Sequence, residues 1–217
     1  MKFNPTKLAC LAGFFLSLTA HAQLEGGSDD IEVHGNFMTT TQIYNIDTAI
    51  GAPIVTEKVR SNTFGNVIVT KGKFSAGARL EAYTPVLLGF DPGYDGMGVP
   101  YRYATYSGDK LEFTIGNFYE QFGSGMILRA YEEPQLGYDN VFDGVRLKYK
   151  VGKGLQLKTM VGRQRLFFGK SEGIVRAADA EWSINDAFEK AQDWKSRITV
   201  GGSFVSKYQE DNSSNFV

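Results

Sequence analysis

The chain has 217 residues, of which 42% are hydrophobic, 13% aromatic and 22% charged, and its 23 basic and 24 acidic side chains give a net charge of −1. This composition excludes a disordered tail, because such chains lack the apolar residues that offset the entropy of folding. The charge balance argues against a broad basic face, so we expect no nucleic-acid partner.

Residues 1–22 have the features of a secretory signal peptide. Two lysines precede an apolar run over residues 8–18, and Ala20 and Ala22 form a small-x-small cleavage site. The run is shorter than the ~20 residues of a spanning helix, which disfavours an N-terminal membrane anchor. We therefore expect export by a cleaved signal peptide, with a single mature domain over residues 23–217.

Cys10 is the only cysteine, and it lies inside the predicted leader. The mature chain can then form no disulfide, so its fold must depend on burial or on a closed ladder of hydrogen bonds. No later segment reaches 18 consecutive apolar residues. A mature chain that enters a membrane must therefore cross it as strands.

The mature sequence alternates with a period of two residues, which is the pattern of strands with one apolar and one polar face. Residues 145–151 and 155–162 alternate on either side of a short glycine-bearing loop, which predicts a hairpin. Further strands are predicted over residues 31–44, 63–70, 74–83, 101–107, 111–118 and 197–204. We expect eight to ten strands, many of them about ten residues long.

Two segments interrupt this pattern. Residues 84–100 contain several prolines and glycines and are predicted to form a long surface loop. In residues 185–194 apolar side chains recur at helical spacing, and Asn185 can cap a first turn. We expect one short amphipathic helix here, in a connection between strands.

Alternation fits a soluble β-sandwich as well as a membrane barrel. Strand length favours the barrel, because soluble strands cluster near ~5 to 6 residues. The apolar faces also contain small residues such as Ala76, Ala78 and Gly202, and tyrosines gather near strand ends. We therefore predict an all-β fold, an antiparallel up-and-down membrane β-barrel, complete or partial, with the sandwich as the alternative.

The sequence also resembles a known family. Residues 116–125 (GNFYEQFGSG), the Asp143-Gly144-Val145 triplet and residues 201–206 (GGSFVS) are similar to an uncharacterised family of Bacteroidota-type outer-membrane β-barrel proteins. The resemblance implies a location and a fold, and no catalytic activity. Members of this family are longer, and residues 212–217 of this chain lack a final amphipathic strand. We therefore expect the chain to be the N-terminal part of a larger barrel.

Two partial motifs suggest phosphate or calcium binding. Gly169-Lys170-Ser171 matches the end of a phosphate-binding loop, but Gln164 stands where that loop needs glycine, which favours a charged hairpin loop. Residues 91–96 resemble a calcium loop, but Gly93 occupies its third position and Arg102 stands where the loop needs a bidentate glutamate. We expect no metal and no cofactor.

His34 is the one histidine of the mature chain, with Glu32 on the same strand face. A hydrolase needs such a base beside a nucleophile, and Ser28 is near only in sequence. We expect no enzyme, and keep a barrel-embedded hydrolase using His34 as the weakest alternative.

Charged residues on the polar strand faces and in the loop after residue 118 are candidates for a lumen lining. They are Arg79, Glu81, Arg129, Arg146, Lys148 and Lys158. The acidic and basic residues of that loop could form a lumenal ion network or an inward-folded loop, and an exposed charged loop is the alternative. The sequence thus predicts an outer-membrane protein, channel-like or the scaffold of an envelope complex, with lipid and other envelope proteins as partners. A secreted sandwich that binds glycans or proteins is the alternative.

Overall fold

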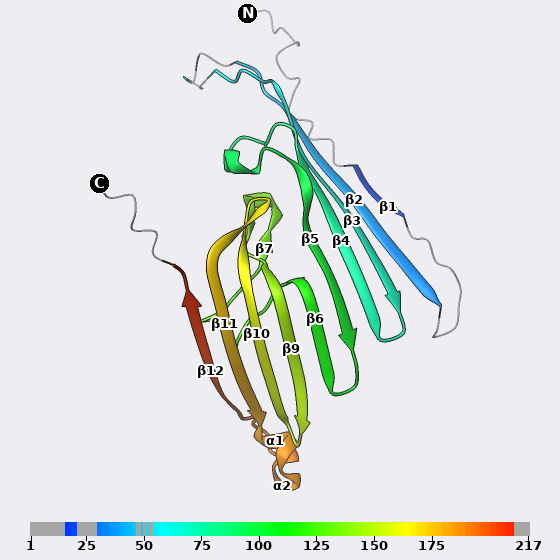
Figure 1. Ribbon diagram of the computed structural model, residues 1–217, viewed down its shortest axis with the longest axis vertical. Helices are drawn as coiled ribbons and strands as arrows, with labels where there is room; N and C mark the ends of the chain where they lie inside the picture. Colours follow the sequence, from blue (N-terminus) through cyan, green and yellow to red (C-terminus); the bar gives the residue numbers. More distant parts are fainter. Residues whose placement is uncertain (1–15, 21–29, 47–48, 50, 52–53, 211–217) are drawn as a thin grey trace, which may run out of the picture.

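The computed structural model describes residues 16–20, 30–46, 49, 51 and 54–210, and it is dominated by antiparallel β structure (Figure 1). Ten strands form one sheet in which neighbours follow chain order, β1-β2-β3-β4-β5-β6-β9-β10-β11-β12. The strands of this sheet are β1 (Leu16–Ala20), β2 (Ile31–Ile43), β3 (Val59–Lys71), β4 (Phe74–Tyr83), β5 (Gly96–Ser107), β6 (Leu111–Phe118), β9 (Phe142–Gly152), β10 (Leu155–Leu166), β11 (Gly169–Ser183) and β12 (Thr199–Tyr208). The antiparallel up-and-down order agrees with the prediction.

The shorter elements lie in the connections. They include a two-stranded ribbon of β7 (Glu132–Glu133) and β8 (Tyr138–Asp139). They also include two 3₁₀ turns, η2 (Pro92–Tyr94) and η3 (Pro134–Leu136), and two single helical turns, α1 (Ile184–Ala187) and α2 (Glu189–Gln192). Among the described residues no helix is long and apolar enough to cross a membrane.

The predicted hairpins are present. Residues 145–151 and 155–162 fall in β9 and β10, and Gly154 between them has φ 74°, a conformation that glycine adopts without strain. Residues 101–107 pair with 111–118 as β5 and β6. The predicted long loop over residues 84–100 is wrong in part, because β5 already begins at Gly96 and the segment before it buries Val86 and Leu87.

One strand and one helix differ from the sequence prediction. β11 was not predicted, because alanines occupy both of its faces and weaken the alternation. The single helix predicted over residues 185–194 is wrong: Phe188 is extended and separates two single turns. Ser183 caps the first turn, while buried Asn185 donates to Ala191 and accepts from the Ile198 N–H, which ties both turns to the start of β12.

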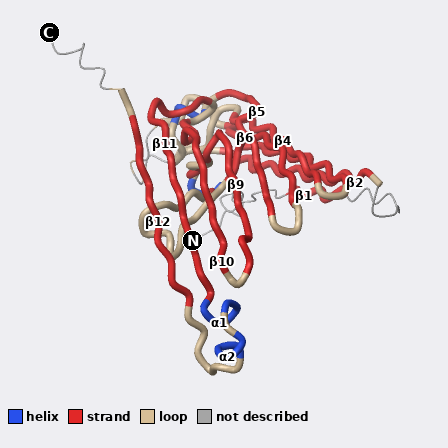
Figure 2. Tube along the Cα trace, turned by 60° about the horizontal axis from the view of Figure 1, so that its bottom comes forward, coloured by secondary structure: helices blue, strands red, loops and turns tan. Residues whose placement is uncertain are grey.

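The sheet is strongly curved (Figures 1 and 2). Three strands separate β4 from β10, so in a flat sheet the two would lie about 19 Å apart at ~4.8 Å per neighbour. Arg165 of β10 nevertheless donates to Glu81 of β4 at 2.9 Å. We call the concave face that carries both residues the inner face, and the opposite one the outer face.

Within the described residues β1 and β12 are the edges of the sheet, each with one neighbour. The sheet is therefore curved but not closed, in contrast to a complete barrel. β1 falls inside the predicted signal peptide; the rest of that segment, and residues 212–217 on which the expectation of a longer barrel rests, lie outside the described residues.

Candidate functional site

The two faces of the sheet differ in polarity, and β4 shows the difference most clearly. Its outer side chains are those of Phe74, Ala76, Ala78, Leu80 and Ala82, whereas the inner set includes arginine, glutamate and tyrosine. Leu80 is 50% exposed and its neighbour Glu81 is 1% exposed. A soluble protein normally has the opposite arrangement, with charges in water and leucine inside.

Apolar side chains continue across the outer face to the other strands. Exposed examples are Val67 and Val69 on β3, Phe113 and Ile115 on β6, Leu157 and Val161 on β10, and Val200 and Phe204 on β12. Aromatic residues mark one border, beside the short hairpin turns: Phe74 contacts Tyr106 with ring centres 5.0 Å apart, and Tyr149 and Trp182 lie at the corresponding ends of β9 and β11.

Charged residues mark the other border of the apolar band. Asp143 on β9 pairs in register with Arg163 on β10 and with the buried, uncharged Asn117 on β6. The Asn117 side chain accepts from the backbone N–H of Arg102 on β5 at 2.8 Å. Asp143 accepts Lys170 Nζ at 2.7 Å and lies 3.6 Å from Arg102 Nη2. From β5 to β10 the outer face is thus an apolar band between an aromatic border and a charged border. On β11 the exposed Arg176, in register with Val161, interrupts the band.

The inner face contains two groups of ion pairs. The first, here the arginine network, joins β4 and β10 to residues 119–141, which we call the inner segment. Arg165 binds Glu81 in a bidentate manner, at 2.9 and 2.5 Å, and also Asp139 at 2.6 Å. Arg79 contacts Glu81 at 2.7 Å, Asp139 at 2.8 Å and Glu132. Two arginines therefore face three carboxylates in a largely dehydrated setting.

Tyrosines complete this network. Tyr119 Oη lies 2.8 Å from Glu132 and 3.0 Å from Asp139, and Tyr83 donates to Glu81 at 3.1 Å. Burial, followed by the nearby negative charge of Asp139 and Glu132, raises the pKa of Tyr119. The phenol therefore stays protonated and can donate to either carboxylate.

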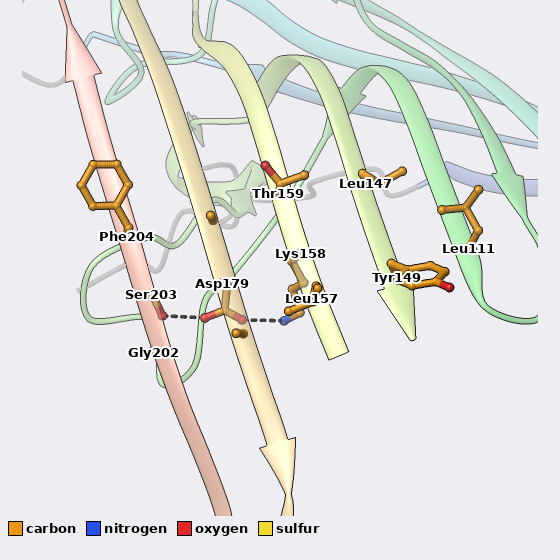
Figure 3. Close-up of a pocket in the computed structure, with 12 residues that line it drawn as sticks. Leu111, Leu147, Tyr149, Leu157, Lys158, Thr159, Asp179, Gly202, Ser203 and Phe204 are labelled. Carbon is orange, nitrogen blue, oxygen red and sulfur yellow. Dashed lines mark hydrogen bonds and ion pairs between the residues drawn. The ribbon is translucent and has the colours of Figure 1, made fainter. Parts of the chain in front are cut away.

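The second group, the lysine network, lies closer to the hairpin turns. Its members are Glu112, Glu120, Arg146, Lys148, Lys158 and Asp179. Arg146 binds Glu112 at 2.7 Å, and Lys148 binds Glu120 at 3.2 Å. Asp179 accepts the Ser203 hydroxyl at 2.5 Å and faces Lys158 at 3.9 Å (Figure 3). Three cations and three anions balance here.

The inner segment packs against the concave face through apolar side chains as well. Phe122, Leu128 and Ala130 form one buried cluster with Met160 and, on β11, Val175 and Ala177. The loop after residue 118 is therefore folded inward, and its Glu120 and Asp139 are in ion networks. The alternative of an exposed charged loop is wrong for these two residues.

Five of the six predicted lining residues lie on the inner face. Arg79, Glu81, Arg146, Lys148 and Lys158 are all held in the two networks. Arg129 is apart from them: it is exposed in the inner segment, with its guanidinium 4.8 Å from the Tyr131 ring. Sequence reasoning missed Arg165 and Asp179, the first because the register shifts between Arg163 and Arg165 and the second because β11 was not recognised.

The remaining candidates have local roles. His34 lies 3.7 Å from Glu32, with both side chains about half exposed, and Ser28 is outside the described residues. Asp91 accepts from the Gly93 N–H and Asp95 from the Val86 N–H. In the part of the chain that the structure describes, no three His, Cys, Asp or Glu side chains are grouped to hold a metal ion.

Comparison with known proteins gives one match. The model of a family of unknown function, DUF6029, matches residues 6–216. The chain belongs to this family. The DUF6029 match confirms that the chain is a member of an uncharacterised family. No curated protein and no solved structure is significantly similar to the chain.

Proposed function

We propose that this DUF6029 protein is an outer-membrane β-barrel protein in which the outer face contacts lipid and the interior is filled. In this proposal it serves as a scaffold of an envelope complex, in preference to an open channel. The observation that carries the proposal is the reversed polarity of the sheet, with Leu80 exposed outside and Glu81 buried inside. Membrane barrels have this apolar-out, polar-in alternation.

The borders of the apolar band support a bilayer environment. Aromatic side chains are enriched where a barrel wall meets the lipid headgroups, and Phe74, Tyr106, Tyr149 and Trp182 lie together at one end of the outer face. Arg102, Asp143 and Lys170 at the opposite border are paired with one another, which suits a headgroup region better than a hydrocarbon core.

The filled interior favours a scaffold. The inner segment and its apolar cluster occupy the concavity between β4 and β10, where a channel would need open water. The lining charges neutralise one another and leave few free to select a passing ion. A secreted β-sandwich needs a second sheet to cover the outer face, and the described residues form one large sheet.

Cell fractionation tests the location. We expect the full chain, expressed in a Gram-negative host, to sediment with outer membranes and to resist extraction by alkaline carbonate. Recovery in the periplasmic supernatant would overturn the proposal and favour the soluble sandwich. In planar bilayers we expect no steady conductance from the purified protein. A stable open channel would contradict the scaffold role and show that the protein forms a pore.

A further inference from the structure

A cavity of about 410 Å³ lies on the inner face, apart from both ion networks. It is enclosed by β2 and β3 on one side and by the inner segment on the other, with Leu87 and Phe90 between them. This volume falls in the range of ~300 to 1,000 Å³ that small-molecule sites occupy. We propose that it binds a small uncharged polyhydroxylated ligand, a sugar or sugar alcohol.

The polar lining sets the class of ligand. It consists of Thr40, Gln42, Asn62, Glu133 and Gln135, and no lysine or arginine contributes to it. Amide and hydroxyl groups both donate and accept hydrogen bonds, which matches a ligand whose hydroxyls do the same. An anion would meet the Glu133 carboxylate with no cation to balance it, so anions are disfavoured.

Asn62 provides the most firmly held polar group of the cavity. It is 2% exposed, and its Oδ1 accepts from the Leu87 N–H at 3.1 Å, which fixes the plane of the amide. Its side chain lines the cavity, where the amide Nδ2 is a hydrogen-bond donor. This donor can bond an acceptor oxygen of a ligand. A cation cannot supply that acceptor.

Apolar groups complete the site. Phe64 and Phe90 lie in the lining, and Phe64 is held edge-on against Tyr83 with ring centres 5.8 Å apart. Sugars present apolar C–H faces as well as hydroxyls, and a site with a few convergent polar groups among aromatic side chains fits both. This inference does not depend on the outer face contacting lipid, because the cavity belongs to the inner face.

Titration calorimetry on the detergent-solubilised full chain tests the proposal. The neutral probes are maltose, cellobiose and mannitol, and the charged probes are glucosamine and glucuronate. We expect at least one neutral probe to bind and glucuronate not to bind. Failure of all three neutral probes, or stronger binding of glucosamine than of every neutral probe, would overturn the proposal.

Two substitutions locate the site. Asn62→Asp keeps the acceptor for Leu87 and removes the amide donor, and Gln135→Ala removes one exposed side chain of the inner segment. Each should weaken binding of the neutral probe by about tenfold, as expected for one lost hydrogen bond. Gln156→Ala, on the inner face of β10 and outside the cavity, is the control and should bind as the parent does. Equal affinity in Gln135→Ala and the control would place any binding elsewhere and reject this site.

Discussion

The guanidinium of Arg79 on β4 donates to the carboxylate of Asp139 in the inner segment at 2.8 Å, and each side chain is 9% exposed. The same carboxylate accepts Arg165 from β10 at 2.6 Å. Asp139 thus joins two strands that three others separate, and fixes the inner segment across the concavity.

Replacing Asp139 with Asn should strongly destabilise the protein. The substitution leaves two buried arginines short of one counter-charge, and breaking a buried pair in this way typically costs ~3 to 5 kcal/mol. The free energy of unfolding, measured by urea titration in detergent micelles, should fall by that amount. Asp109→Asn is the matched control, because its pair with Lys73 is exposed and should contribute less than ~1 kcal/mol. Equal losses in the two variants would contradict the importance of the arginine network.

Phe122→Ala should release the inner segment. Phe122 is 2% exposed in the cluster with Met160, and removing a buried phenylalanine costs ~3 to 5 kcal/mol. We expect limited proteolysis to cleave within residues 119–141 much faster than in the parent. Met126→Ala in the same segment is 91% exposed and should leave the cleavage rate unchanged. A slow rate in both variants would mean that the cluster does not anchor the segment.

A charge introduced on the outer face should destabilise the protein strongly only if that face contacts lipid. Ile115 is 54% exposed on β6, so in a water-soluble protein Ile115→Arg would change stability by less than ~0.5 kcal/mol. In a bilayer the same change should cost about 1 kcal/mol near the headgroups and up to ~2 to 4 kcal/mol near the midplane. Unfolding in lipid vesicles distinguishes the two values. Met126→Arg, away from the apolar band, provides the control and should be tolerated.

The contribution of Tyr119 to the free energy of unfolding should decrease at high pH. Burial raises its pKa in the folded protein above the ordinary value of ~10, so its hydrogen bonds contribute fully below pH ~10. As the pH rises further, ionisation in the unfolded chain stabilises the unfolded state, and this contribution is lost. The difference in unfolding free energy between the parent and Tyr119→Phe should therefore narrow above pH ~10. A difference that stays constant to pH 11 would contradict the assignment.

Local alternation predicts the strands where the two faces differ sharply in polarity. β4 follows the prediction to the residue, because apolar and polar side chains alternate along its whole length. β11 was not predicted, because the consecutive alanines Ala177 and Ala178 face opposite sides of the sheet and show no difference in polarity. Alternation predicted that Arg79 and Glu81 share the polar face, but it did not predict their partners, because Glu132 and Arg165 lie 53 and 84 positions away in the sequence.

The inner segment could be anticipated only as one of two alternatives. Its charges are equally compatible with an exposed loop, and the choice depends on Phe122 and Leu128 finding a surface that β10 and β11 supply. The position of Arg165 depends on a register shift that no periodic pattern contains. Nothing in the local sequence marks the Asn62 cavity, because four separate segments line it.

Fluorescence quenching at two neighbouring positions of β9 shows whether the outer face of the sheet lies against lipid. The predicted mature chain has no cysteine, so Leu147→Cys on the outer face and Lys148→Cys on the inner face each provide a single labelling site. Lys148 is one member of a six-residue network, and thermal unfolding of both variants checks that the fold is retained. With a fluorescent thiol label and brominated lipid vesicles, we expect strong quenching at position 147 and little at position 148. Equal quenching at the two positions, or quenching at neither, would contradict a sheet whose outer face lies against lipid.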